Sequence, residues 1–426
     1  MNLSSQVFYL PAQEGTLLLI NRAKGGSVWG VDPVARAQHI AWMPITSGNC
    51  TAAAAGLEYE YTCAEQGTDS TVGRIPDFGV SDVEPNLFKQ PLNVETTSSG
   101  PKTQLTTAEQ SLLGTFSTAA VLFGVPSTAQ AASIPLSRAA VSSMLSGTIT
   151  DWSKVADAPL AGKTNVVVCR RVQGSGTQAT FNAYFNSWPC ANNSVVSTNS
   201  LPPKRMNNSP GYSSTATTIT VNAASGYTVI ENPSSGDVVS CLNKADAGGN
   251  HTFTADNGKA VTVNFDTGGY RAIGVLSFDS NTASKKKLTA DPVGTVRWDY
   301  RDLNGVTTSK ANARNGTYDF FAEQTMQYRN DGYVTFDTVL NDYVFNYGIP
   351  SSGSAAEQKK AFIDLFITRA GDPTILNGIA KPEVAAAVAA LPYYYAPDDV
   401  TTAGLNTLKV SHSNGSCKPV QRKSPY

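Results

Sequence analysis

Residues 169–181, CRRVQGSGTQATF, decide how the rest of the chain is interpreted. The valines before Cys169 make residues 166–170 a β-branched strand, and apolar side chains at helical spacing follow Thr177. Between them lies the turn Gly-Ser-Gly-Thr, residues 174–177. The stretch therefore predicts a strand, a tight loop and the N-terminus of a helix.

This loop has the features of an anion site. Gly174 and Gly176 let the backbone approach a ligand, and the first amides of a helix point outward with the helix dipole behind them. Ser175 and Thr177 add hydroxyl donors, and Arg171 can place a planar guanidinium on two oxygens of a tetrahedral anion. A plain flexible turn is the alternative. A nucleophilic Ser175 is disfavoured, because the pattern Gly-x-Ser-x-Gly and a nearby histidine are both absent.

The composition narrows the class of protein. The 426 residues carry a formal net charge of −1, and 15% of them are charged. Such a length suffices for a sizeable core and favours two domains over one. A charge near zero disfavours nucleic acid or an anionic membrane as the main partner. No apolar run reaches the ~18 residues that a membrane-spanning helix needs.

The six cysteines indicate an oxidising compartment, periplasmic or extracellular. Cys50 and Cys63 bracket a short polar loop, and Cys190 and Cys241 bracket a Ser/Thr/Asn-rich stretch, so we expect these two disulfides. Cys169 and Cys417 remain, either as a third pair or with Cys169 as a buried free thiol. Because no signal peptide follows Met1, we expect a removed leader replaced by an initiator methionine, with a cytoplasmic protein as the alternative.

Residues 171–177 resemble the Arg-x-x-Gly-Ser-Gly-Thr motif of the PstS-like phosphate-binding proteins of ABC transporters, a group of type 2 periplasmic binding proteins. Further stretches resemble the same family: GGSVWGV at 25–31, FGVSDVEP at 78–85, MLSGTITDWSKV at 144–155, RAIGVLSF at 271–278 and NGTYDFF at 315–321. The resemblance thus extends through most of the chain.

The resemblance implies an α/β fold of two lobes joined by two hinge crossovers, at 112–128 and 271–278. Lobe one would comprise residues 1–122 and 273–426, and lobe two residues 123–272. Lobe two would carry an insertion at about 191–270, interpreted as a decorated loop. Within it, Asn257-Gly258 between two alternating runs predicts a β-hairpin. The pattern of residues also predicts a helix capped by Ser137 and ending at Gly147, and helices over 354–369 and 382–392.

The resemblance also implies a ligand site in the cleft between the lobes. Arg171 would supply the charge-assisted pair, and Ser175, Gly176 and Thr177 the hydrogen-bond donors. Ser27 would donate from the other lobe, and Asp82 would accept a proton from the anion. From the residues alone, Ser27 is equally well interpreted as a helix N-cap and Asp82 as a turn former.

Asp82 gives this implied site a chemical preference. A buried carboxylate repels an oxyanion unless the ligand brings a proton to share. Phosphate carries such a proton near neutral pH, whereas sulfate does not. The implied ligand is therefore inorganic phosphate or a similar protonated tetrahedral oxyanion.

Two features depart from the family. Gln173 stands where the family often has an acidic residue that orients the arginine, which would leave Arg171 freer. The family's first strand and its Gly-Ser/Thr-rich ligand loop have no counterpart in SQVFYLPAQEG, residues 5–15. We therefore expect a chain that starts one strand late, through truncation, processing or a segment supplied by another molecule.

We expect a binding protein without chemistry of its own, which uses no cofactor or metal and works with an ABC transporter membrane complex. An enzyme is disfavoured because His39, His251 and His412 lie in unrelated contexts. The alternative is a secreted structural or interaction protein that kept the fold and lost the anion site. A phosphoester hydrolase would need a metal cluster or an activated nucleophile. Self-association stays open.

Overall fold

The computed structural model describes most of the chain, with gaps. Backbone and side chains are described for residues 25–42, 48–51, 64, 73–95, 102–191, 203–206, 217–255, 258–288, 294–329, 363, 367, 370, 410–412 and 415–421. The backbone alone is described for residues 5–12, 15–22, 52, 60–63, 334–337, 342–345, 387–388 and 422.

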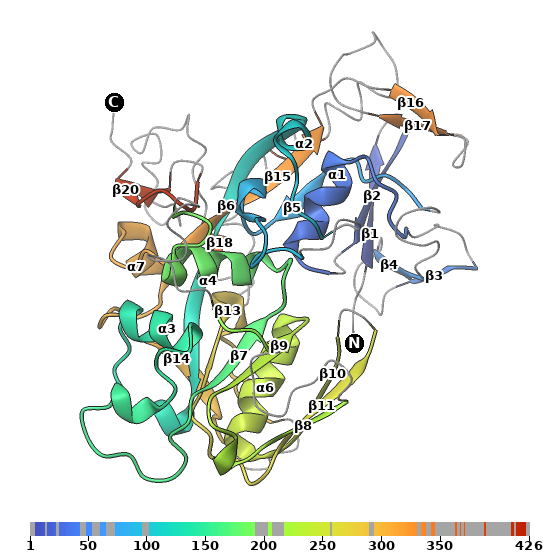
Figure 1. The fold of residues 1–426 in the computed structure, drawn as a ribbon. Helices are drawn as coiled ribbons and strands as arrows, with labels where there is room; N and C mark the ends of the chain where they lie inside the picture. The colour runs from blue at the N-terminus through green and yellow to red at the C-terminus, as the bar shows by residue number, and fades with distance from the viewer. Residues whose placement is uncertain are drawn as a thin grey trace.

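The chain has an α/β fold of two lobes, as expected, and a nine-stranded sheet runs through both (Figure 1). The main path of the sheet is β5-β15-β6-β12-β7-β9, and β13, β14 and β18 also pair with β6. These strands are β5 (Gly79–Ser81), β6 (Leu113–Thr128), β7 (Val167–Arg171), β9 (Thr228–Asn232), β12 (Ala272–Gly274), β13 (Leu276–Ser277), β14 (Trp298–Arg301), β15 (Phe321–Arg329) and β18 (Ala387–Val388).

Strand β6 connects the lobes. Its first part pairs antiparallel with β15 from Leu113 to Leu122, and its last part pairs with β12, β13 and β14. The strand covers nearly all of residues 112–128, the stretch that the sequence analysis interpreted as the first crossover. Gly124 provides space, since a Cβ there would lie 2.3 Å from the ring of Tyr300, and Pro126 is accommodated opposite the same tyrosine.

The lower lobe in Figure 1 holds several of the described helices. They are α3 (Arg138–Leu145), α6 (Ser235–Ala247) and the short turns η3 (Ala129–Ala131), η4 (Trp152–Lys154) and η7 (Ala223–Ser225), with α4 (Gly176–Asn186) at the junction with the upper lobe. The predicted helix after Ser137 is confirmed, because the Ser137 side chain accepts a hydrogen bond from the Ala140 amide and Gly147 follows with φ +71°.

The predicted hairpin is confirmed as β10 (Gly249–Thr254) and β11 (Ala260–Phe265), with Gly258 at φ +79°. Strand β8 (Thr218–Val221) extends it to a three-stranded sheet. The interpretation of all of 191–270 as a decorated loop is wrong, because β9 lies in the main sheet and α6 packs on β7. Their buried residues, among them Ile230, Val238 and Leu242, belong to the core of this lobe.

The remaining elements lie around the upper lobe and at the junction between the lobes. Strands β1 (Ser5–Ala12), β2 (Gly15–Arg22), β3 (Cys50–Ala52) and β4 (Glu60–Cys63) form a separate sheet in the order β2-β1-β4-β3. The others are η1 (Ser27–Gly30), α1 (Asp32–Ala35), η2 (Pro85–Leu87), α2 (Thr107–Ser111), η8 (Phe278–Ser280), α7 (Lys310–Asn315), β16 (Val334–Asp337), β17 (Asp342–Phe345), β19 (Val410–Ser411) and β20 (Gln421–Arg422).

Two helix predictions in the C-terminal part have different outcomes. Residues 387–388, within the predicted helix 382–392, form β18 instead and pair with Ala120 and Val121 of β6. Alanine and valine occur in strands as well as in helices, so composition alone does not decide between the two. The predicted helix 354–369 lies mostly outside the described residues, although Ile363 and Ile367 are helical and buried.

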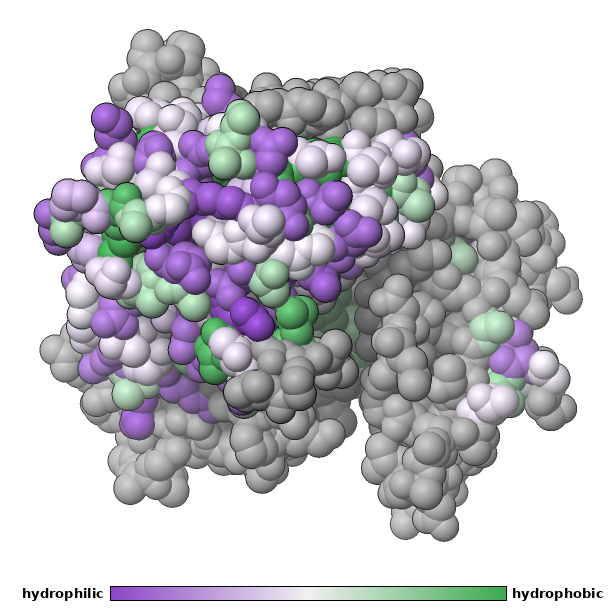
Figure 2. Space-filling view, turned by 90° about the horizontal axis from the view of Figure 1, so that it is seen from below, coloured by the Kyte–Doolittle hydropathy of each residue, from purple (hydrophilic) through white to green (hydrophobic). Residues whose placement is uncertain are grey.

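The surface of the described part is mixed in character. Figure 2 shows hydrophilic residues spread over one face, with only separate apolar spots between them. The large hydrophobic side chains exposed in the described part are Val80, Phe116 and Val296. Within the same ranges, no helix is both long and apolar enough to cross a membrane.

The disulfides correct one prediction. Cys169 pairs with Cys241 and Cys190 with Cys417, so the predicted Cys190–Cys241 bridge is wrong. Helix α6 packs against β7 and brings Cys241 onto the buried Cys169, which leaves Cys190 to the C-terminal segment. Cys50 is disulfide-bonded, and the ladder of β3 and β4 sets it directly opposite Cys63, as the predicted pairing requires.

We expect the double variant Cys190→Ser/Cys417→Ser to unfold at lower urea concentration than the wild type. The bridge joins residues 227 positions apart, and loop entropy for that length gives an upper value of about 5 kcal/mol. Unfolding curves of the two proteins measure the loss. An unchanged midpoint, or peptide mapping that joins Cys190 to Cys241, would contradict the assignment.

Candidate anion site

The N-terminus of α4 is built as the sequence predicts. Strand β7 ends at Arg171, the chain turns at Gly174 with φ +83°, and Ser175 caps the helix by accepting a hydrogen bond from the Gln178 amide at 3.3 Å. Phe181 of the helix packs edge-on against Phe320, with ring centroids 4.7 Å apart. This contact holds α4 against the segment that leads into β15, so the helix N-terminus has a fixed position.

Ser27 and Asp82 meet the N-terminus of α4. Ser27 Oγ donates a hydrogen bond to Asp82 Oδ2 at 3.0 Å and accepts one from the Gly176 amide at 3.2 Å. The N-cap of η1 is Gly26, not Ser27, and Asp82 lies in the loop after β5. Ser27 is therefore not an N-cap, and its hydroxyl connects the predicted carboxylate to the predicted anion loop.

Two glycines make this close approach of the two backbone segments possible. An added Cβ on Gly26 would lie 2.3 Å from the Gly174 carbonyl oxygen, and one on Gly176 would lie 2.5 Å from Ser27 Oγ. The Val28 amide also donates to the Gly174 carbonyl at 3.0 Å. The segment before η1 thus lies directly on the loop before α4, which only residues without a side chain permit.

The environment of Asp82 disfavours its charged form. Burial raises the pKa of this carboxyl above its ordinary value, and the negative charge of Asp279 adds to the effect. Hydrogen bonds from Ser27 and Thr177 and the positive charge of Arg171 lower the pKa in part. Asp82 is thus a carboxyl poised to hold or share a proton beside the donors of α4.

Arg171 is buried, with 7% of its surface exposed, and its guanidinium is held at the start of α6. Its Nη1 donates to Ser235 Oγ and its Nη2 to the Pro233 carbonyl, both at 2.9 Å. Its own amide donates to Gln178 Oε1 at 3.1 Å. The sequence analysis missed Ser235, which opens α6, although the capping box of Ser234 and Asp237 gave a local signal for that helix start.

Gln173 does not leave Arg171 freer, as its neutral side chain suggested. Its side-chain Nε2 donates to the carbonyls of Pro91 and Val94, the latter at 2.9 Å, and not to any group of Arg171. Ser235 and Pro233 fix the guanidinium in place of the family's acidic residue. Gln173 instead ties the anion loop to the segment before α2.

A second buried hydrogen-bond network holds α4 in place, and the sequence analysis did not predict it. Asn182 Nδ2 donates to Asn93 Oδ1 at 2.6 Å, and Asn93 Nδ2 donates to the Leu87 carbonyl at 2.6 Å. Gln178 Nε2 donates to Asn182 Oδ1 at 2.9 Å. Because all three amide side chains are buried, these bonds fix the register between α4 and the loop that carries η2.

The structure therefore brings together all six predicted site residues. Ser175, Gly176 and Thr177 form the start of α4, Ser27 and Asp82 contact it, and the charge of Arg171 acts on Asp82. Within the described ranges, no group of three His, Cys, Asp or Glu residues could hold a metal ion. His251 is buried between Ser240 and Asn232, which is a packing role.

We expect Gly176→Ala to destabilise the protein, because the new Cβ would lie 2.5 Å from Ser27 Oγ and 2.8 Å from Asp82 Cβ. Overpacking of this kind costs about 1–3 kcal/mol of unfolding free energy. The matched control is Gly236→Ala in the first turn of α6, where the nearest atom, Ser234 Oγ, lies 3.5 Å away. There we expect no loss, and a gain of up to about 1 kcal/mol. Equal effects of the two substitutions in urea unfolding would contradict the close approach.

Known proteins resemble the chain in fold. A family profile described as a PBP superfamily domain matches residues 116–368. An ABC-type phosphate transport receptor from Vibrio cholerae is 14% identical, with 69% of this chain and 74% of that chain covered and a TM-score of 0.32. PstS from Borrelia burgdorferi is 12% identical, with 60% of this chain and 69% of that chain covered and a TM-score of 0.30. The ancestral soluble variant of the Human Phosphate Binding Protein is 16% identical, with 76% of this chain and 78% of that chain covered and a TM-score of 0.39. No curated protein gives a significant sequence match.

The family profile covers more than half of the chain. It includes most of β6 and all of β7, α4, α6 and β15, and with them Arg171 and the loop 174–177. Ser27 and Asp82 lie before the matched range. The chain belongs to the PBP superfamily, as the resemblance to the PstS-like type 2 binding proteins predicted.

Proposed function

We propose that the chain is an extracytoplasmic solute-binding protein that binds inorganic phosphate, or a similar protonated tetrahedral oxyanion, between its lobes. The observation that carries this proposal is the contact of Asp82 and Ser27 with the N-terminus of α4. A carboxyl with a raised pKa beside outward-pointing amides suits an anion that brings its own proton. An ABC transporter complex would be the partner that receives the solute.

The division into lobes is part of this proposal. Ser27 and Asp82 precede β6 in the chain, whereas Arg171 and the 174–177 loop follow it. The boundaries 1–122 with 273–426, and 123–272, put the two groups on different lobes. The segments that cross between them would be β6 and β12–β13, which pair with one another. Opening about these strands would separate Ser27 from Gly176 and admit the ligand, and it would also part Phe181 from Phe320 and Asn182 from Asn93.

Binding would exchange hydrogen bonds rather than create all of them anew. Ser27 would turn its hydroxyl from Asp82 to a ligand oxygen, and the proton of the ligand would replace it on the Asp82 carboxylate. The Gly176 and Thr177 amides would donate to the anion, as would the Thr177 hydroxyl, and Arg171 would turn its guanidinium from Ser235 to two ligand oxygens. The Ser27 hydroxyl, the Asp82 carboxyl and the Gly176 amide would keep a partner in both states, which offsets part of the cost of desolvation.

A second candidate is a secreted structural or interaction protein on the same fold. It is favoured by the same bonds, because Ser27, Asp82 and Gly176 satisfy one another and Arg171 is held by Ser235 and Pro233. In that case these residues would form a polar contact that holds the two lobes together. Calorimetric titration of the full chain with phosphate separates the candidates, since only a solute-binding protein takes up the anion.

We expect Arg171→Ala to weaken phosphate binding by about 2–4 kcal/mol, because a buried charge-assisted pair with the anion is lost. Titration calorimetry of both proteins measures the difference. Lys154→Ala removes an exposed positive charge elsewhere in lobe two and serves as the control. Phosphate affinity that is equal in wild type and Arg171→Ala would remove Arg171 from the site.

Asp82 should give sulfate binding a pH dependence that phosphate binding lacks at neutral pH. Sulfate brings no proton, so it requires the protonated carboxyl of Asp82, whose pKa is raised by burial. As the pH falls toward that pKa, sulfate affinity of the wild type should rise by about tenfold per pH unit, since one proton is taken up with the anion. Asp82→Asn supplies a permanent donor, so its sulfate affinity should be higher at neutral pH and independent of pH. Competitive titration of phosphate against sulfate tests both, and an unchanged selectivity in Asp82→Asn would leave Asp82 as a turn residue.

A further inference from the structure

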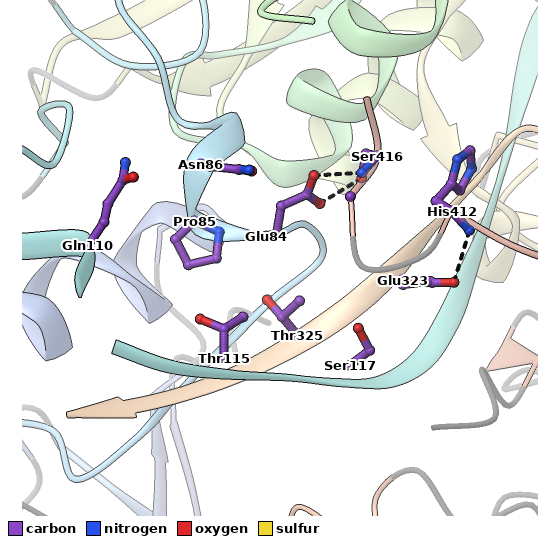
Figure 3. Close-up of a pocket in the computed structure, with 11 residues that line it drawn as sticks. Glu84, Pro85, Asn86, Gln110, Thr115, Ser117, Glu323, Thr325, His412 and Ser416 are labelled. Carbon is purple, nitrogen blue, oxygen red and sulfur yellow. Dashed lines mark hydrogen bonds between the residues drawn. The ribbon is translucent and has the colours of Figure 1, made fainter. Parts of the chain in front are cut away.

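A separate polar cavity lies between the sheet of the upper lobe and the end of the chain. It has a volume of about 250 Å³. Strands β6 and β15 form its floor, the loop leading into η2 forms one wall, and residues 410–412 and 415–421, which we call the C-terminal strap, form another (Figure 3). Asp82 contacts the anion site and Glu84 contacts the strap, so the segment 82–84 separates the two sites.

Glu84 is a buried carboxylate on this cavity, with 8% of its surface exposed. Its Oε1 accepts a hydrogen bond from the Ser416 amide at 2.6 Å, and its Oε2 accepts one from Ser416 Oγ at 2.7 Å. Both donors are neutral groups of the strap. They orient Glu84 without neutralising its charge.

Glu323 is the second buried carboxylate, with 6% of its surface exposed. Its Oε1 accepts hydrogen bonds from Ser411 Oγ and from the His412 amide, the latter at 3.2 Å. In the described part of the chain no group donates to its Oε2, although the residue lines the cavity. Oε2 of this buried carboxylate can therefore accept a hydrogen bond from a ligand in the cavity.

The cavity therefore holds two buried negative charges. No Lys or Arg nitrogen of the described residues lies within 4.0 Å of either carboxylate. Burying a charge without an opposite charge costs several kcal/mol, so a cation in the cavity would lower the free energy of both groups. An ammonium group, with three donors, matches the open acceptor position of Glu323.

The other end of the cavity offers a donor. Gln110 of α2 lies at the opposite end of the drawn residues from Glu323 and His412 (Figure 3). Its Nε2 is buried and has no hydrogen-bond partner in the described part of the structure. A ligand oxygen would satisfy this nitrogen, since an unpaired buried donor costs about 1–3 kcal/mol.

We propose that this cavity binds a small amino alcohol, with the ammonium group at Glu323 and Glu84 and the hydroxyl oxygen at Gln110. The hydroxyls and amides of the strap hold the carboxylates in position, and strands β6 and β15 form the floor of the site. This site is separate from the anion site, and its ligand has the opposite charge.

The test uses three matched compounds on the full chain, by titration calorimetry at low salt. 4-Amino-1-butanol carries both groups, 1,4-butanediol lacks the charge, and n-butylamine lacks the oxygen. We expect the amino alcohol to bind at least about tenfold more tightly than the diol, since the buried charge pair is lost with the diol. We also expect it to bind more tightly than the amine. Equal binding of amino alcohol and diol, or tighter binding of calcium chloride than of any amine, would overturn the proposal.

Two variants make the assignment specific. Glu323→Gln retains an acceptor for Ser411 and the His412 amide but removes the charge, so it should lose about tenfold in affinity for both amines and little for the diol. Asp157→Asn removes one exposed carboxylate in lobe two and should change none of the three affinities. If Glu323→Gln binds the amino alcohol as tightly as Asp157→Asn does, the carboxylate does not hold the ammonium group and the proposal fails. A circular dichroism spectrum like that of the wild type establishes that the variant is folded.

Discussion

The hydrogen bonding of β6 is the constraint on which the rest of the structure depends. Five described strands pair with it: β12, β13, β14, β15 and β18. Because one unbroken strand serves both lobes, β5, which leads to Asp82, and β7, which ends at Arg171, share a common sheet. The passage between the lobes depends on Gly124, whose missing side chain leaves room for Tyr300, and the Tyr300 hydroxyl donates to the Ser277 carbonyl of β13 at 2.6 Å.

The candidate anion site follows from that arrangement and from a second constraint of distance. Backbones before η1 and before α4 come so close that side chains are excluded at Gly26 and Gly176. The contact brings together a carboxyl with a raised pKa, a buried guanidinium and the first amides of a helix. Phosphate binding needs such a combination of groups, and so does a polar contact between the lobes that is made by protein groups alone. The difference between these two roles is whether Ser27 and Arg171 exchange partners.

Local features of the fold could be predicted from the sequence, and long-range ones could not. The strand, loop and helix at 166–186, the capped α3 and the β10–β11 hairpin depend on glycines, caps and alternation within a few residues. The pairing of Cys169 with Cys241 depends on the packing of α6 on β7, which spacing along the chain does not reveal. Likewise β9 and α6 lie in a polar stretch whose few apolar residues happen to be the buried ones. The loop 174–177 and Arg171 were predicted from the residues themselves, whereas Ser27 and Asp82 came from the resemblance. Nothing in the sequence linked Ser235 and Pro233 to Arg171 as its partners.

The bridge between Cys190 and Cys417 has a consequence for the integrity of the molecule. It closes more than half of the chain into a covalent ring that begins just after α4 and ends in the strap. A protease that cuts one peptide bond anywhere inside this ring opens it without releasing a fragment. The two pieces stay joined until a reductant breaks the bridge at Cys417, which is an exposed residue. In an oxidising compartment a nicked molecule would therefore keep its lobes, its cleft and its strap together.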